Sequence, residues 1–88
     1  MQLEFLDKFS KDIDRINNKS VKAKLVKLID QFESSENLDG IPNLKKLAGH
    51  KSAYRVRISD YRVGFFYSGT TVIFARLVHR KDIYKVFP

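Results

Sequence analysis

The sequence contains no cysteine, and this absence limits the chemistry available to its 88 residues. Without thiols the chain forms no disulfide, holds no thiolate zinc site and has no cysteine nucleophile. No apolar run approaches the roughly 18 residues needed to span a bilayer, and the N-terminus lacks a signal-peptide pattern. Its two histidines have no nearby pair of acids, so we expect no metal and no cofactor. We therefore expect a cytoplasmic protein that does not act at a membrane.

Acidic residues are scarce in the second half of the chain. Residues 1–40 have a net charge of −1, whereas residues 41–88 have a net charge of +8. A field of this kind attracts polyanions such as RNA, and it also attracts acidic protein segments. The length allows one domain, residues 1–88, with a single core.

The second half predicts an antiparallel sheet. Three apolar, alternating segments are separated by the turn signals Ser59-Asp60 and residues 68–71. The predicted strands are about Ala53–Ser59, Tyr61–Tyr67 and Val72–His79. Arg76 interrupts the apolar third strand, and the pattern gives it no role.

A two-residue turn at Ser59-Asp60 would set Arg57 opposite Arg62. One face of the sheet then carries Tyr54, Val56, Ile58, Tyr61, Val63, Phe65 and Tyr67, and the other carries Arg55, Arg57, Arg62, Gly64 and Phe66. Like charges directly opposite one another destabilise a sheet, so the arrangement indicates an anion site. The simpler alternative is a solvated face whose arginine stems cover apolar neighbours.

The first half predicts a strand and a helix hairpin. Gln2–Phe5 reads as a strand, followed by a helix with Asp7 as N-cap and a second helix over about Ser20–Phe32. Asp12 and Asp14 beside Lys11 and Arg15 predict a solvated helix face. Residues 34–43 predict a loop, and residues 44–47 a helical turn. The fold class is α+β: a strand and an antiparallel helix hairpin on one face of an antiparallel sheet of three or four strands, with the arginine face bare.

Two stretches, LKKLAGHKSAYRVRISDYRVGFFY and LVHRKDIYKVF, resemble the RelE/ParE superfamily of bacterial type II toxins. The resemblance implies a RelE-like fold and a cognate antitoxin as partner. The RelE branch cuts mRNA in the A site of the 70S ribosome without a metal: the 2′-hydroxyl attacks the adjacent phosphate and leaves a 2′,3′-cyclic phosphate. The ParE branch inhibits DNA gyrase.

The resemblance also implies roles for individual residues. Arg62 and Arg80 would stabilise charge on the phosphate, and Tyr84 would stack on a base or assist proton transfer. Arg55 and Arg57 stand where a nuclease of the branch has lysines, one of them the base. Because arginine stays protonated, the base must come from elsewhere, and we select His79 over the alternatives His50 and Lys51. The candidate catalytic residues are Arg55, Arg57, Arg62, His79, Arg80 and Tyr84. The candidate RNA-binding residues are Lys45, Lys46, Lys51, Phe66, Lys81 and Lys85.

Three functions remain open at this point. The first is a ribosome-dependent endoribonuclease toxin, which the cations and the tyrosine favour. The second is a ParE-like gyrase inhibitor, and the third is a non-catalytic module that only binds an antitoxin. All three predict an acidic antitoxin segment as partner.

Overall fold

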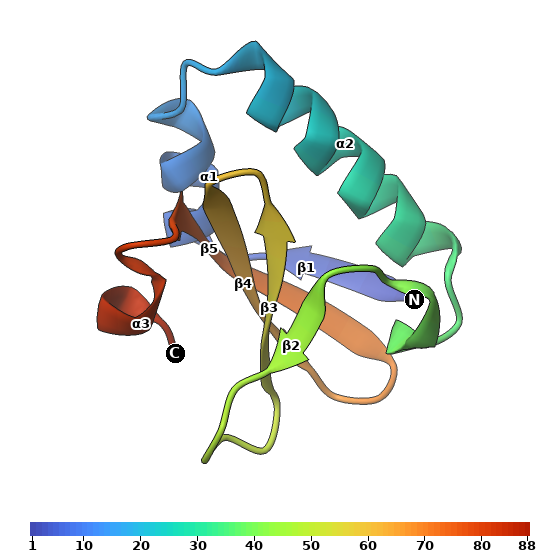
Figure 1. Ribbon diagram of the computed structural model, residues 1–88. Coiled ribbons are helices and arrows are strands. Elements are labelled where there is room, and N and C mark those ends of the chain that lie inside the picture. The colour runs from blue at the N-terminus through green and yellow to red at the C-terminus, as the bar shows by residue number, and fades with distance from the viewer.

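The computed structural model describes all residues from 1 to 88 (Figure 1). It is an α+β domain in which helices pack on a five-stranded sheet. The strands are β1 (Gln2–Phe5), β2 (Leu44–Lys46), β3 (Ala53–Ile58), β4 (Tyr61–Tyr67) and β5 (Thr71–His79). The helices are α1 (Asp7–Asp14), α2 (Lys19–Ser34) and α3 (Ile83–Val86), with a single 3₁₀ turn at Leu38–Gly40.

The sheet has the strand order β1-β5-β4-β3-β2. All neighbours are antiparallel except β1 and β5, which run parallel, with Gln2 opposite Thr71 and Phe5 opposite Phe74. The predicted all-antiparallel sheet of three or four strands is therefore wrong in strand number and in the direction of β1. The end of α2 lies beside the chain start, where the Met1 amino group donates to the Ser35 carbonyl at 2.8 Å. From there the chain continues to β2 at the edge of the sheet opposite β1, and β5, the last strand, lies between β1 and β4.

Strand β2 replaces the helical turn predicted over residues 44–47. Its three residues pair antiparallel with β3, and Lys45 lies opposite Arg55. Three residues are too few to show a period of two, so the local pattern could not distinguish this strand from a helical turn.

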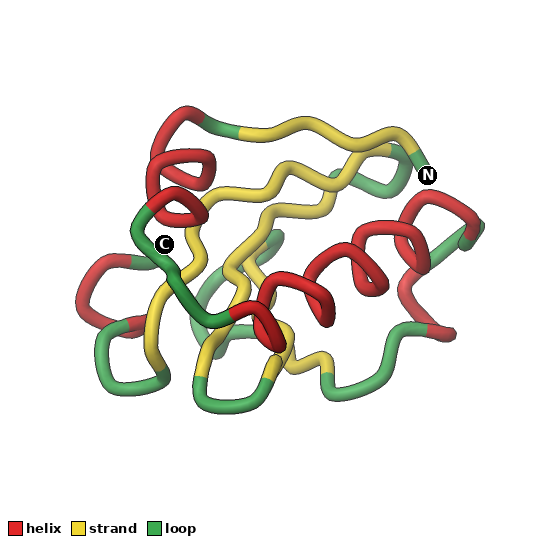
Figure 2. Tube along the Cα trace, turned by 90° about the horizontal axis from the view of Figure 1, so that it is seen from above, coloured by secondary structure: helices red, strands yellow, loops and turns green.

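Both predicted helices of the hairpin are present and lie on one face of the sheet. Helix α1 begins after Leu6, and Asp7 is its first residue rather than the predicted N-cap. Helix α2 begins after Asn18, whose side-chain oxygen accepts hydrogen bonds from the backbone N–H groups of Ser20 (2.9 Å) and Val21 (3.2 Å). Figure 2 shows this long helix beside the strands, with the two termini at opposite sides of the molecule.

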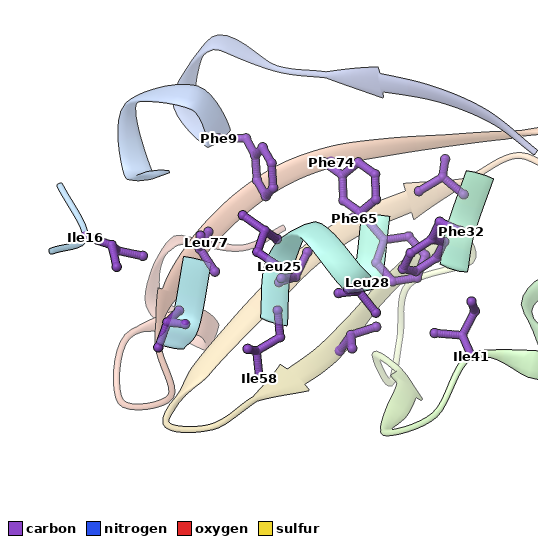
Figure 3. Close-up of a cluster of buried hydrophobic side chains, with 14 residues drawn as sticks. Phe9, Ile16, Leu25, Leu28, Phe32, Ile41, Ile58, Phe65, Phe74 and Leu77 are labelled. Carbon is purple, nitrogen blue, oxygen red and sulfur yellow. The ribbon is translucent and has the colours of Figure 1, made fainter. Parts of the chain in front are cut away.

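The main core fills the space between these helices and the sheet (Figure 3). Phe9 from α1 and Phe32 from α2 are fully buried, and both rings contact Phe74 of β5, with centroids 5.3 and 5.2 Å apart. Val56, Ile58, Val63 and Phe65 complete the sheet side of this core, as strand alternation predicted. No helix is both long and apolar enough to cross a bilayer.

The opposite face of the sheet is only partly bare. A second cluster of Leu47, Ala53, Ala75, Ile83 and Phe87 covers one end of it, and Phe66 packs against Phe87 with ring centroids 5.1 Å apart. Gly64 makes this possible, because a Cβ at that position would lie 2.7 Å from the Phe87 ring. The prediction of a bare arginine face is therefore wrong where α3 docks. The bulge between Gly64 and Phe65 shifts the alternation of β5 and places Ala75 in this cluster.

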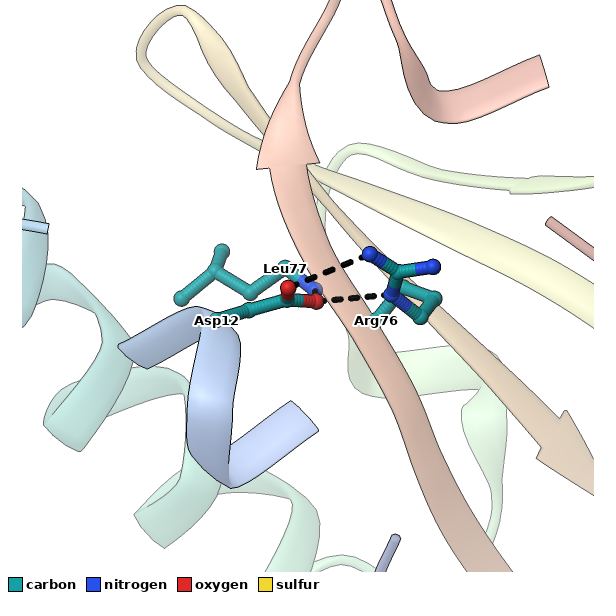
Figure 4. A network of polar contacts seen from close by, with 3 residues as sticks. All are labelled: Asp12, Arg76 and Leu77. Carbon is teal, nitrogen blue, oxygen red and sulfur yellow. Dashed lines mark hydrogen bonds and ion pairs between the residues drawn. The ribbon is translucent and has the colours of Figure 1, made fainter. Parts of the chain in front are cut away.

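Asp12 is buried rather than solvated, and it explains Arg76 (Figure 4). Its carboxylate accepts from Arg76 Nε at 2.8 Å, from Arg76 Nη2 at 3.2 Å and from the backbone N–H of Leu77 at 2.9 Å. Strand β1 ends at Phe5, so beyond Phe74 the edge of β5 has no strand partner. Asp12 satisfies an edge N–H there and ties α1 to the sheet.

Candidate functional site

The β3–β4 hairpin builds a cluster of arginines. Arg57 lies directly opposite Arg62, and Arg55 lies opposite Gly64, as the two-residue turn predicted. Arg57 Nη2 donates to the side-chain oxygen of Asn43 at 3.2 Å, and Arg62 Nη1 donates to the carbonyls of Ser59 (3.2 Å) and Tyr61 (3.0 Å). These contacts to neutral acceptors orient the guanidinium groups without neutralising them.

No carboxylate pairs with this cluster. The ion pairs of the molecule are Arg76–Asp12 and Lys85–Asp82. Burial lowers the pKa of Arg62, and the positive charges of Arg55, Arg57 and Arg80 lower it further, while Tyr84 acts in the opposite direction. Since four cations interact unfavourably here, a bound anion would relieve their repulsion.

A groove lies between α2 and the β3–β4 turn. Its volume is about 630 Å³, and Leu28, Val56 and Ile58 form its apolar part. Lys24 Nζ donates to Ser59 Oγ at 2.7 Å and so links the helix to the turn, which lies beneath α2 in Figure 1. The charged residues that line the groove are Lys24, Lys27, Arg57, Asp60, Arg62 and Arg80.

A second cleft of about 360 Å³ lies next to α3. Lys45, Lys46, His50, Tyr84 and Phe87 line it, with Leu47, Ala48 and Pro88. A shallow basic depression lined by Lys45, Arg55, Arg57 and Arg62 shares residues with both the groove and this cleft. Groove, depression and cleft therefore form one continuous basic band, the shape that a single-stranded polyanion follows.

Comparison with known proteins identifies the chain. A family model described as the ParE toxin of the type II toxin–antitoxin system parDE matches residues 3–84. The chain belongs to the RelE/ParE superfamily of type II toxins. Toxin RelE3 of Methanocaldococcus jannaschii is 33% identical to it over the full length of both chains.

Solved structures agree with this assignment. The RelB–RelE antitoxin–toxin complex from Methanococcus jannaschii matches with a TM-score of 0.83 and 32% identity, over 97% of this chain and 99% of that one. An archaeal RelE–RelB complex from Pyrococcus horikoshii shares the fold, with a TM-score of 0.69 and 19% identity over 93% of this chain and 97% of that one. The family model and the two relatives of 32–33% identity together show that the chain is a RelE-like type II toxin.

The structure brings most predicted catalytic residues of the toxin together. Arg57, Arg62 and Arg80 line the groove, and Arg55 adjoins them in the depression. Tyr84 is 62% exposed in the cleft and lies close enough to Arg62 to act on its pKa, which it raises.

His79 is not part of the groove. It lies opposite Tyr61, a residue that packs against the main core, so strand alternation puts it on the helix face of the sheet. Its ring contacts the Tyr61 ring edge to face at 5.8 Å, and its Nδ1 accepts from the backbone N–H of Lys81 at 3.2 Å. His79 is therefore absent from the groove lining, and its role as the base stays a prediction.

The predicted RNA-binding residues divide into three groups. Lys45 and Lys46 line the cleft, and Lys51 lies in a shallow depression beside it with His50. Lys81 and Lys85 are exposed outside groove and cleft, and Lys85 lies 3.9 Å from Asp82. Phe66 is half-buried and packs against Phe87, and its stacking on a base stays a prediction.

Sequence reasoning missed three charged residues of the groove: Lys24, Lys27 and Asp60. The two lysines appear in the sequence only as the polar face of an amphipathic helix. Nothing local shows that this face borders the hairpin turn. Nowhere do three histidine or acidic side chains gather as a set able to hold a metal ion.

Proposed function

We propose that this toxin cleaves mRNA in the ribosomal A site by metal-independent attack of a 2′-hydroxyl on the adjacent phosphate. The observation that carries the proposal is the set of Arg57, Arg62 and Arg80 along one groove with no carboxylate paired to them. In this reaction the 2′-oxygen bonds to phosphorus and the bond from phosphorus to the 5′-oxygen breaks. Negative charge grows on the phosphoryl oxygens in the transition state, where preoriented cations stabilise it.

Different residues of the basic band would have different roles in this reaction. The positive charges of Arg57 and Arg80 both lower the pKa of Arg62, so all three act at one place, and this supports Arg62 as the contact of the reacting phosphate. Arg55 and Lys45 continue the positive surface and would hold the neighbouring phosphates. The exposed ring of Tyr84 is available to stack on a base at the cleft end, and its hydroxyl is the candidate donor to the leaving 5′-oxygen.

The same unpaired charge predicts an antitoxin partner for this toxin. A segment that neutralises the band would be acidic and would order on binding. The M. jannaschii relative, of 32% identity, is in complex with the antitoxin RelB, which supports this inference.

Replacing Arg80 by alanine tests the proposal. In a reconstituted translation reaction, primer extension on the mRNA should show breaks within A-site codons for the wild type. Loss of one such electrostatic donor should lower the cleavage rate by about 10²- to 10³-fold. Arg15→Ala is the matched control, because Arg15 is an exposed arginine outside the groove, and it should cleave as the wild type does.

Equal cleavage by the wild type and Arg80→Ala would remove Arg80 from the mechanism. The second candidate is gyrase inhibition, which the name of the matching family model favours. An absence of mRNA breaks, together with inhibition of supercoiling by purified gyrase, would transfer the assignment to that function and make the basic band a docking surface.

A further inference from the structure

The proposed cleavage requires a group that takes the proton of the attacking 2′-hydroxyl. The arginines of the groove stay protonated and cannot do so. His79 is not among the residues that line the groove, and His50 lies in the cleft beside α3. A proton acceptor within the groove therefore has to come from another residue type.

Asp60 is the only carboxylate among the residues that line the groove. It is exposed, and its side chain forms no hydrogen bond and no ion pair, although three arginines and two lysines line the same groove. Both oxygens are therefore free to accept a proton from a bound ligand.

The backbone around Asp60 is fixed from both sides. Its carbonyl accepts from the backbone N–H of Arg80 at 2.7 Å, which ties the turn to the segment that carries Arg80. Its neighbour Ser59 adopts a positive φ of 53° and accepts from Lys24 Nζ. The turn is thus held between α2 and the end of β5, with Asp60 beside the position that a phosphate would take.

We propose that Asp60 is the general base of the cleavage, an inference that rests on the proposed nuclease function. Its carboxylate accepts the proton of the 2′-hydroxyl as the 2′-oxygen bonds to phosphorus. The 5′-oxygen leaves with its electron pair and takes a proton from the Tyr84 hydroxyl or from water. The products are a 2′,3′-cyclic phosphate and a 5′-hydroxyl, and the carboxylate then returns its proton to solvent.

A carboxylate suits this arrangement for a physical reason. A carboxylate oxygen can accept a proton, which the guanidinium groups and ammonium groups of the other charged residues in the groove do not do while they carry their charge. The surrounding cations bind the phosphate, which brings a 2′-hydroxyl to a carboxylate that would otherwise repel RNA. Asp60 therefore depends on the arginine cluster for substrate, and the cluster depends on Asp60 for proton transfer.

The test compares Asp60→Asn, Asp60→Glu and the control Asp14→Asn in single-turnover cleavage on stalled ribosomes. Asparagine keeps the size and the turn preference of aspartate but cannot take the proton. We expect Asp60→Asn to lower the rate of the cleavage step by about 10²- to 10⁴-fold and to leave ribosome affinity unchanged. Asp60→Glu should recover part of the rate. Asp14 is an exposed acid on α1, and its variant should match the wild type.

Four outcomes separate the explanations. Loss of rate with unchanged affinity, and partial recovery by glutamate, supports the base. Less than a tenfold loss in Asp60→Asn overturns it while leaving the nuclease proposal intact. Asp60→Asn could instead weaken ribosome affinity or lower the melting temperature enough to explain the lost rate. That result would mean that Asp60 only supports the turn, and it would overturn the base. Absence of cleavage by the wild type refutes the nuclease proposal itself.

Discussion

Replacing Asp12 by alanine should strongly destabilise the toxin. The substitution removes three hydrogen bonds at once, two from Arg76 and one from the backbone N–H of Leu77. The Asp12 side chain is 5% exposed and that of Arg76 is 17% exposed, so the arginine is left largely buried without its counter-ion.

The expected decrease in the free energy of unfolding follows from this burial. Breaking a buried ion pair by removing one partner costs about 3–5 kcal/mol. The remaining exposure of Arg76 lets water reach part of its guanidinium, which places the expected loss near the lower value, at about 3 kcal/mol. A domain of this size loses about 4–8 °C of melting temperature per kcal/mol, so the melting temperature should fall by about 12–24 °C.

Urea denaturation and thermal melting followed by circular dichroism measure the effect. Asp14→Ala is the control, because Asp14 is exposed on the same helix and has no ion-pair partner. Asp12→Asn should lose less, since its amide oxygen still accepts one of the three bonds. The pair raises the pKa of Arg76, so the contribution of that cation is present at neutral pH and disappears only in strongly alkaline solution. A loss for Asp12→Ala within 1 kcal/mol of that for Asp14→Ala would refute the reasoning, and would mean that other contacts hold α1 on β5.

Two further predictions concern the basic band and the C-terminal segment. Because the pKa of Arg62 is lowered, its charged form costs folding free energy at neutral pH, and that cost is relieved only as the pH rises past the lowered value. Arg62→Gln should therefore be at least as stable as the wild type. At matched ionic strength, phosphate should raise the melting temperature of the wild type more than that of the variant. Equal shifts in melting temperature would argue against an anion site. Gly64→Ala should displace Phe87, because the new Cβ would meet its ring, and should cost about 1–3 kcal/mol. Faster hydrogen exchange of the backbone amides in α3 would show that Phe87 is displaced. Unchanged exchange rates would show that the Phe87 ring accommodates the new methyl group without moving α3.

The hairpin could be predicted because its signals are local. A two-residue turn fixes the register of the strands that it joins, so the Arg57–Arg62 pairing and the division of faces followed from the sequence alone. The helix hairpin followed in the same way from the period of its apolar residues.

The features that were missed depend on contacts between distant residues. Asp12 and Arg76 are 64 positions apart, and each looks like an ordinary charged residue in its own segment. The covering of Gly64 and Phe66 by Phe87 likewise depends on where α3 docks. Adjacency of His79 to Arg80 in sequence likewise does not imply that both line the groove, because neighbours in a strand point to opposite faces, and only Arg80 lines it.

The parallel pairing of β1 with β5 joins the first strand of the chain to the last, so the sheet is complete only when nearly the whole chain is present. A chain still in synthesis that ends before residue 71 has no neighbour for its first strand, and it also lacks Arg80 of the groove. Sheet completion and assembly of the arginine cluster therefore both wait for the same late segment. Pairings across so many residues also form slowly. A chain that lacks this segment therefore has neither a complete sheet nor a complete groove.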